Sequence, residues 1–101
     1  MDIMRAAAPE GARTYIEHRA AIMDNPKLQA VPPKYKLLIG IGVAAALQSS
    51  TCTAQWTKQA VNAGATHEEI GEAILVSRLM KAATVNDTAA DALAWLQGSA
   101  G

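Results

Sequence analysis

The sequence is poor in cysteine and in aromatic residues. It has a single cysteine and only four aromatic residues, none of them phenylalanine. One cysteine excludes an internal disulfide framework, so the small disulfide-rich secreted scaffolds do not apply. With few aromatic side chains, the apolar half of the 101 residues is mostly Ala, Leu, Ile and Val. Alanine has the highest helix propensity, and this composition therefore favours closely packed helices.

The sequence also lacks an excess of charge of either sign, since nine basic and nine acidic residues are scattered along it. The absence of a basic block argues against a nucleic-acid partner. The longest apolar run, residues 37–47, is too short to cross a bilayer, and "MDIMRAAAPEGAR" has no apolar core of signal-peptide length. We therefore expect a cytoplasmic protein with no membrane partner. Because His18 and His67 are far apart in the sequence, we expect both side chains to be solvated rather than to form a metal site.

Periodicity and end signals predict an all-α chain that forms a single domain over residues 1–101. Pro9 suits the first position of a helix, Gly64 suits a left-handed C-cap, and Thr66 with Glu69 has the spacing of a capping box. "TVND" at 84–87 is expected to cap a last helix. No alternation long enough to predict a strand is present. The expected helices are 9–23, 33–48, 51–62, 67–82 and 85–97.

The apolar run "LLIGIGVAAAL" at 37–47 is apolar all round, which predicts a helix buried on every side. Gly40 and Gly42 each cost about 1 kcal/mol in a helix interior, and we expect them to admit the close approach of a neighbouring backbone. A single chain of this length buries too little surface to cover such a helix. We therefore predict an obligate homo-oligomer.

Cys52 follows "SST" at the expected start of the third helix, where hydroxyl groups can cap the helix. Backbone amides and the positive end of the helix dipole at that place favour the thiolate, which indicates a reactive thiol. The alternative is that Cys52 is a small buried apolar residue, the commoner environment of a free cysteine. The residues alone leave both interpretations open.

The stretch "YKLLIGIGVAAALQSSTCTAQWTKQAVNAGATHEEIGEAI" resembles the core of the carboxymuconolactone decarboxylase and AhpD-like (alkylhydroperoxidase) family, over about residues 32–83. The resemblance rests on a lysine-led apolar helix, a short polar turn, a cysteine, and then "A-x-x-A-G-A-T-x-E-E-I". It implies an AhpD-like bundle of about five helices that forms homo-oligomers, commonly trimers or hexamers, and needs no cofactor. It also implies a peroxidase or thiol-redox (antioxidant) activity.

The sequence departs from the redox motif of that family at three of four positions. Redox-active members have a Cys-x-x-Cys at the start of the third helix, a histidine four residues later, and a glutamate near the start of the preceding helix. Here Cys52 matches the second cysteine, while Ser49 stands at the first. Trp56 stands at the histidine and Leu37 at the glutamate. Serine cannot resolve a sulfenic acid, and neither indole nor leucine can accept a proton as imidazole does.

Three functions are consistent with this pattern. The first is a peroxidase or thiol-redox enzyme reduced to one catalytic cysteine, Cys52, with an external thiol as reductant. The second is a non-catalytic ligand-binding or scaffold protein on the same fold, whose ligand contacts Gln48, Ser49 and Trp56. The third and weakest is a decarboxylase-like enzyme acting on a lactone acid, because the decarboxylase branch also places a histidine near Trp56.

Overall fold

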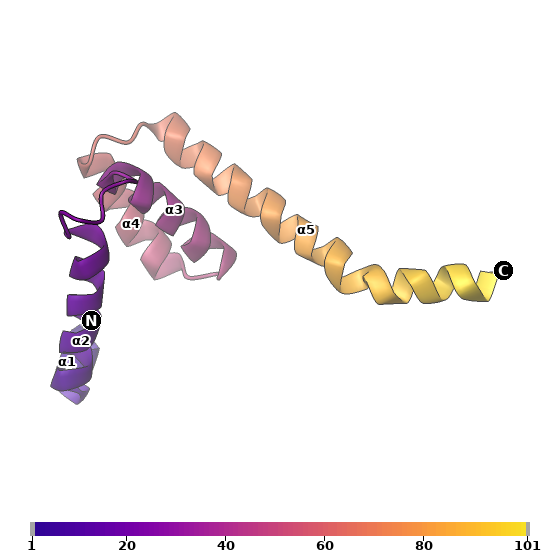
Figure 1. The fold of residues 1–101 in the computed structure, drawn as a ribbon, viewed down its shortest axis with the longest axis horizontal. Coiled ribbons are helices and arrows are strands. Elements are labelled where there is room, and N and C mark those ends of the chain that lie inside the picture. The colour runs from indigo at the N-terminus through magenta and orange to yellow at the C-terminus, as the bar shows by residue number, and fades with distance from the viewer. Residues whose placement is uncertain (1, 101) are drawn as a thin grey trace. The chain divides into compact units, whose positions relative to one another are not determined.

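The structure is a computed structural model that describes residues 2–100, and these residues form five α-helices and no β-strand. In chain order the helices are α1 (Asp2–Ala7), α2 (Pro9–Met23), α3 (Pro33–Ala46), α4 (Ser50–Asn62) and α5 (His67–Ala100) (Figure 1). The all-α prediction is confirmed. None of the described helices is both long and apolar enough to cross a membrane.

The chain forms two compact units, residues 1–36 and residues 37–101. The first unit contains α1, α2, the connector and the first residues of α3. Helix α2 has the predicted bounds, with Pro9 at its first position, where the missing amide hydrogen costs nothing. Helix α1 was not predicted, because its six residues are too few to show a helical period.

The connector after α2 is held by two side chains that donate to backbone carbonyls. Nζ of Lys36 donates to the carbonyl oxygen of Ile22, 2.8 Å away, and also to that of Leu28. Nε2 of Gln29 donates to the carbonyl oxygens of Met23 and Asn25, at 3.3 and 2.9 Å. The last carbonyls of a helix have no partner within it, so Lys36 and Gln29 together satisfy the C-terminus of α2.

We therefore expect Lys36→Met to lower the free energy of unfolding by about 1.5–3 kcal/mol, the contribution of hydrogen bonds to a charged group. Urea denaturation followed by circular dichroism measures this loss. Lys34→Met is the matched control, because it removes the same charge from the same turn of α3. The Lys34 ammonium lies over the ring of Tyr35, 4.9 Å from its centroid. An equal loss in both variants would contradict the specific role of Lys36.

The second unit packs around one face of α3. Leu37, Ile41 and Ala44 are buried at helical spacing, and Ile41 is the largest fully buried side chain among the described residues. The opposite face carries Val43 and, past the end of the helix, Leu47, which is 75% exposed. The prediction that this segment is buried on every side is therefore wrong for one chain, because α4 and α5 cover only part of the helix surface.

The local signals around α4 and α5 act as predicted. Gly64 adopts φ +94°, and the amides of Gly64 and Ala65 donate to the carbonyls of Val61 and Ala60, which closes the end of α4. At the start of α5, the Glu69 amide donates to Oγ1 of Thr66, and the Thr66 amide donates to the Glu69 carboxylate. These two bonds are the reciprocal pair of a capping box.

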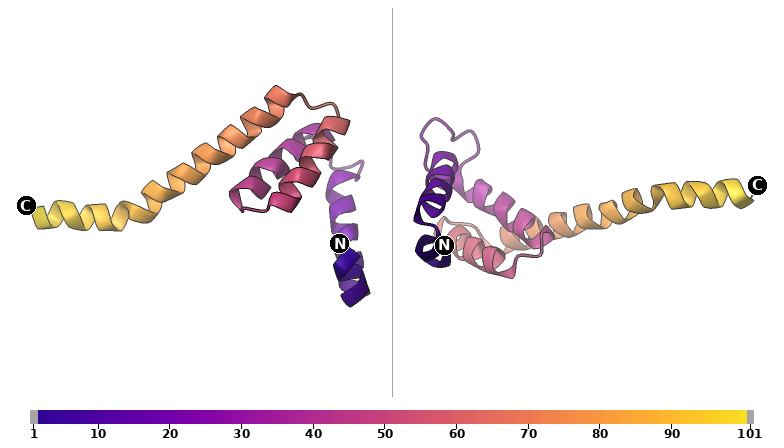
Figure 2. Two further views of the ribbon diagram at one scale, coloured as in Figure 1. Left: turned by 180° about the vertical axis from the view of Figure 1, so that it is seen from behind. Right: turned by 90° about the horizontal axis from the view of Figure 1, so that it is seen from below.

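Helix α5 corrects the prediction of two helices at 67–82 and 85–97, because it is continuous from His67 to Ala100. "TVND" does not cap a new helix. Oγ1 of Thr84 instead donates to the carbonyl oxygen of Lys81, 2.6 Å away, within the same helix. Bonds of this kind bend helices, and the ribbon of α5 changes direction where its colour passes to yellow (Figure 1, Figure 2). Neither glycine nor proline stands at 82–85 to end the helix.

Candidate functional site

The turn between α3 and α4 is short and unusually tight. Gln48 adopts φ 62°, a left-handed conformation that normally favours glycine. The amide of Gln48 donates to the carbonyl of Ala45, and the amide of Ser49 donates to the carbonyl of Ala44. This pair of bonds ends α3 in the same way as the glycine-containing end of α4, but with a glutamine in the strained position.

Ser49 belongs to both helices of this turn. Its amide closes α3, while its hydroxyl oxygen accepts from the amide of Cys52 at 3.3 Å and caps the start of α4. Its carbonyl oxygen accepts from both the amide and the hydroxyl of Thr53, at 3.0 and 2.7 Å. The serine at the first-cysteine position of the motif therefore has a structural role as the N-cap of α4.

Cys52 lies in the first turn of α4, as predicted, and its side chain is exposed. The exposure contradicts the alternative of a buried apolar cysteine. A thiol at this position is accessible to small molecules and to external thiols.

Trp56, one turn further along α4, is half-buried, and its indole ring lies against the backbone of α3 at Gly40. A Cβ atom at position 40 would lie 3.2 Å from Cδ2 of the ring and in severe overlap with Cε3 and Cζ3. Gly40 therefore makes room for the Trp56 side chain. The sequence analysis predicted instead that a neighbouring backbone would approach at this position, and that prediction is wrong for Gly40. Gly42 does face a neighbouring backbone, but at an ordinary contact distance, since a Cβ there would lie 3.5 Å from the carbonyl oxygen of Ala73 on α5.

Leu37, at the glutamate position of the motif, is buried on the same face of α3 as Gly40 and Ile41. An ionised carboxylate in that apolar environment would be costly without a partner. The histidine and glutamate positions are therefore occupied by apolar side chains that pack. Gly40 was not identified as part of the site from the sequence, because only the packing of α4 on α3 brings it to Trp56.

Beside the turn is a shallow pocket of about 420 Å³. Gln48 and Ser49 both contribute to its lining, whereas Cys52 and Trp56 do not. Ser49 is therefore hydrogen-bonded to Cys52 and lines the same pocket as Gln48. Trp56 instead packs against α3. Sequence reasoning missed the other lining residues, which are Ala45, Ser50, Thr53 and Ala54.

The histidines and the other polar residues near the turn are solvated. His18, His67, Gln55 and Lys58 are all exposed. Among the described residues, no group of three or more His, Cys, Asp and Glu side chains lies close enough together to hold a metal ion.

Comparisons with known proteins show the family and the fold of this chain. The model of the carboxymuconolactone decarboxylase family matches residues 9–97. A crystal structure of a protein from Methanobacterium thermoautotrophicum, a structural-genomics target, is similar with a TM-score of 0.82 and 27% sequence identity. The similarity covers 91% of this chain and 97% of that one. Among curated proteins, none matches the sequence.

Proposed function

Since the chain belongs to the carboxymuconolactone decarboxylase family, we propose that it is a thiol-redox protein of the peroxidase type in which Cys52 is the only reacting thiol. The observation that supports this function is the exposed sulfur in the first turn of α4. Ser49 holds this turn in place through its hydroxyl group.

The reaction with a hydroperoxide proceeds in two stages. The Cys52 thiolate attacks one peroxide oxygen, the O–O bond breaks, and the other oxygen leaves as an alcohol after taking a proton from water. Cys52 is oxidised to the sulfenic acid. An external thiol then displaces water to form a mixed disulfide, and a second external thiol releases the Cys52 thiol and an external disulfide. The external reductant is necessary because Ser49 has no sulfur.

The packing of Trp56 and Leu37 limits this chemistry. The indole carries only a donor N–H and the leucine carries no ionisable group, so neither can relay a proton to the leaving oxygen. We therefore expect turnover to be slower than in a protein with the full relay.

A second candidate function is the binding of a ligand without catalysis, in a scaffold protein of the same fold. The observation that favours it is the Trp56 ring on Gly40, which fills with apolar packing the place where the relay histidine is expected. The pocket beside Gln48 and Ser49 is the ligand site in this case. A decarboxylase-like reaction ranks third, because Trp56 leaves the histidine role of that branch unfilled as well.

We further propose that the chain acts as a homo-oligomer, a trimer or a hexamer, in which residues 1–101 form one domain. Large apolar side chains of the second unit are exposed, among them Leu47 at 75%, Leu79 at 68% and Trp95 at 69%. Such an apolar surface is typical of a protein that is covered by a partner. A cytoplasmic location agrees with the proposal, because that compartment keeps a lone thiol reduced.

Consumption of an alkyl hydroperoxide in the presence of glutathione tests the redox function. We expect turnover by the wild type and a fall to the uncatalysed rate in Cys52→Ser, because the substitution removes the nucleophile. Thr51→Ala, an exposed neighbour in the same turn that does not line the pocket, is the matched control and should retain activity. If the wild type shows no turnover, the ligand-binding function is the better account. If Cys52→Ser retains the turnover of the wild type, Cys52 is not the reacting thiol and the redox proposal fails.

A further inference from the structure

Helix α5 exposes an apolar stripe that its own chain leaves uncovered. Leu75, Val85 and Leu96 are 50, 64 and 54% exposed. Together with smaller side chains they follow one side of the helix at alternating steps of three and four residues, the spacing by which helices pair. The positions are Leu75, Arg78, Ala82, Val85, Ala89, Ala92 and Leu96. Six of the seven are apolar.

The stripe adjoins a groove between α3 and α5. This groove has a volume of about 470 Å³, and Ala45 and Ala46 of α3 form one side of it. The α5 side includes Ile74 and three stripe residues, Arg78, Ala82 and Val85. The groove and the outer part of the stripe are therefore one continuous surface, with small side chains that allow a helix to approach closely.

The outer part of α5 cannot fill this groove itself. Residues beyond Val85 belong to the same continuous helix as the groove residues, and they extend away from α3 and α4 (Figure 1, Figure 2). A helix without tertiary packing is marginal in water, so this segment needs a partner. The groove and the outer stripe each lack a partner within the described residues of the second unit.

We propose that α5 pairs antiparallel with α5 of a second copy, so that the outer part of each helix lies in the α3–α5 groove of the other. One contact then covers both surfaces in both chains, as a two-fold interface does. With the axis near Val85, Leu75 lies level with Leu96 of the partner subunit, and Ala82 lies level with Ala89 of the partner subunit. Large side chains meet at the two ends and alanines meet near the middle.

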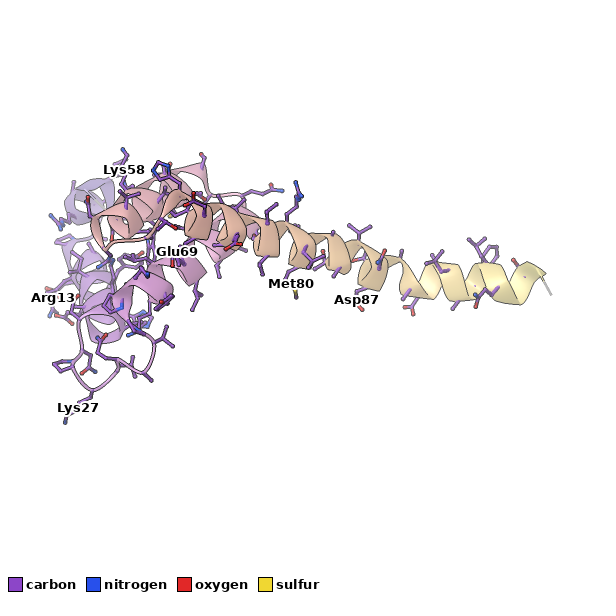
Figure 3. All side chains as sticks on the ribbon, turned by 90° about the horizontal axis from the view of Figure 1, so that it is seen from above. Arg13, Lys27, Lys58, Glu69, Met80 and Asp87 are labelled. Carbon is purple, nitrogen blue, oxygen red and sulfur yellow. The ribbon has the colours of Figure 1, made fainter. Side chains whose placement is uncertain are left out.

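Charge agrees with this pairing. Arg78 and Lys81 lie at the groove, whereas residues 82–100 contain two acidic residues, Asp87 and Asp91, and no basic residue. The antiparallel register places these oppositely charged segments at the same level along the interface. Figure 3 shows Met80 and Asp87 on one side of α5, and helical geometry places the stripe on a different side, so Asp87 stays in water.

This inference rests on the self-association proposed above and is independent of the chemistry of Cys52. It also distinguishes between the two expected assemblies, because a two-fold contact occurs in a hexamer of two trimers and not in a lone trimer. Light scattering should therefore give an even number of chains.

Disulfide crosslinking tests the register, in a Cys52→Ser background that contains no other cysteine. The double variant Leu75→Cys and Leu96→Cys should form a covalent dimer on mild oxidation. Positions 75 and 96 are about 30 Å apart along one helix, so a bond between them must join two chains. Neither single variant should crosslink, because like positions are far apart in an antiparallel pair. Crosslinking of the single variants, or none in the double variant, overturns the proposal even if the protein is oligomeric.

A matched pair of charge substitutions tests which face of α5 forms the interface. Ala92→Glu puts a carboxylate on the stripe, whereas Ala94→Glu puts the same group about 200° around the helix. We expect Ala92→Glu to raise the dissociation constant of the two-fold contact at least about 100-fold, since a buried unpaired charge is strongly unfavourable, and Ala94→Glu to leave the mass unchanged. Equal effects of the two variants, with helicity retained in circular dichroism, would rule out the stripe as the interface.

Discussion

Gly40→Ala is expected to destabilise the protein by up to about 2 kcal/mol, although alanine is the better helix former. The added methyl group overlaps the Trp56 ring, and overpacking of this kind costs typically 1–3 kcal/mol, offset by a propensity gain of about 1 kcal/mol. Gly42→Ala, two residues along the same helix, is the matched control. Its methyl group finds ordinary contact distances, so we expect a gain of up to about 1 kcal/mol.

Removing the Trp56 ring should reverse the sign of the effect of Gly40→Ala on stability. Trp56→Ala alone is expected to cost about 2–3 kcal/mol, less than the 3–5 kcal/mol of a fully buried tryptophan, because Trp56 is half-buried. In that background, Gly40→Ala no longer meets the ring and should stabilise the helix. Urea denaturation at one fixed protein concentration measures the cycle. If Gly40→Ala costs the same with and without Trp56, the ring does not pack on Gly40.

The second large effect is expected from Ser49→Cys, which restores the missing sulfur of the motif. The side chain of residue 49 lies over the first turn of α4, with its terminal atom 3.3 Å from the Cys52 amide. A thiol there is placed to attack a sulfenic acid on Cys52 and release water. We expect one equivalent of hydroperoxide to convert the variant to an intramolecular disulfide, whereas the wild type stops at the sulfenic acid until an external thiol arrives.

Ser50→Cys is the control for this variant, because side chains two residues apart on a helix do not face each other. Loss of the Ser49 cap should lower the stability of reduced Ser49→Cys by about 1 kcal/mol. Free-thiol titration and intact mass after peroxide treatment measure the outcome. If both variants, or neither, form an intramolecular disulfide, then the position of Ser49 above the first turn is not what determines resolution.

Local sequence signals determined much of this structure. The start of α2 at Pro9, the capping box of Thr66 and Glu69, the left-handed Gly64 and the place of Cys52 in the first turn of α4 all follow from the residues. Each depends on hydrogen bonds or backbone preferences within about five residues. The family was also recognisable, because the order of an apolar helix, a polar turn and a cysteine is itself a local pattern.

What only the tertiary structure decided concerns contacts between distant residues. Trp56 lies 16 positions from Gly40, and no periodicity relates them, so only the packing of α4 on α3 shows that the ring fills the relay position. Likewise, the exposure of Cys52 and the hydrogen bonds of Lys36 depend on where helices and connectors meet. The sequence determined which segments are helical and how they end, since those energies are local. Which faces are covered, and which are left for a second copy, depends on helix packing that a linear pattern does not encode.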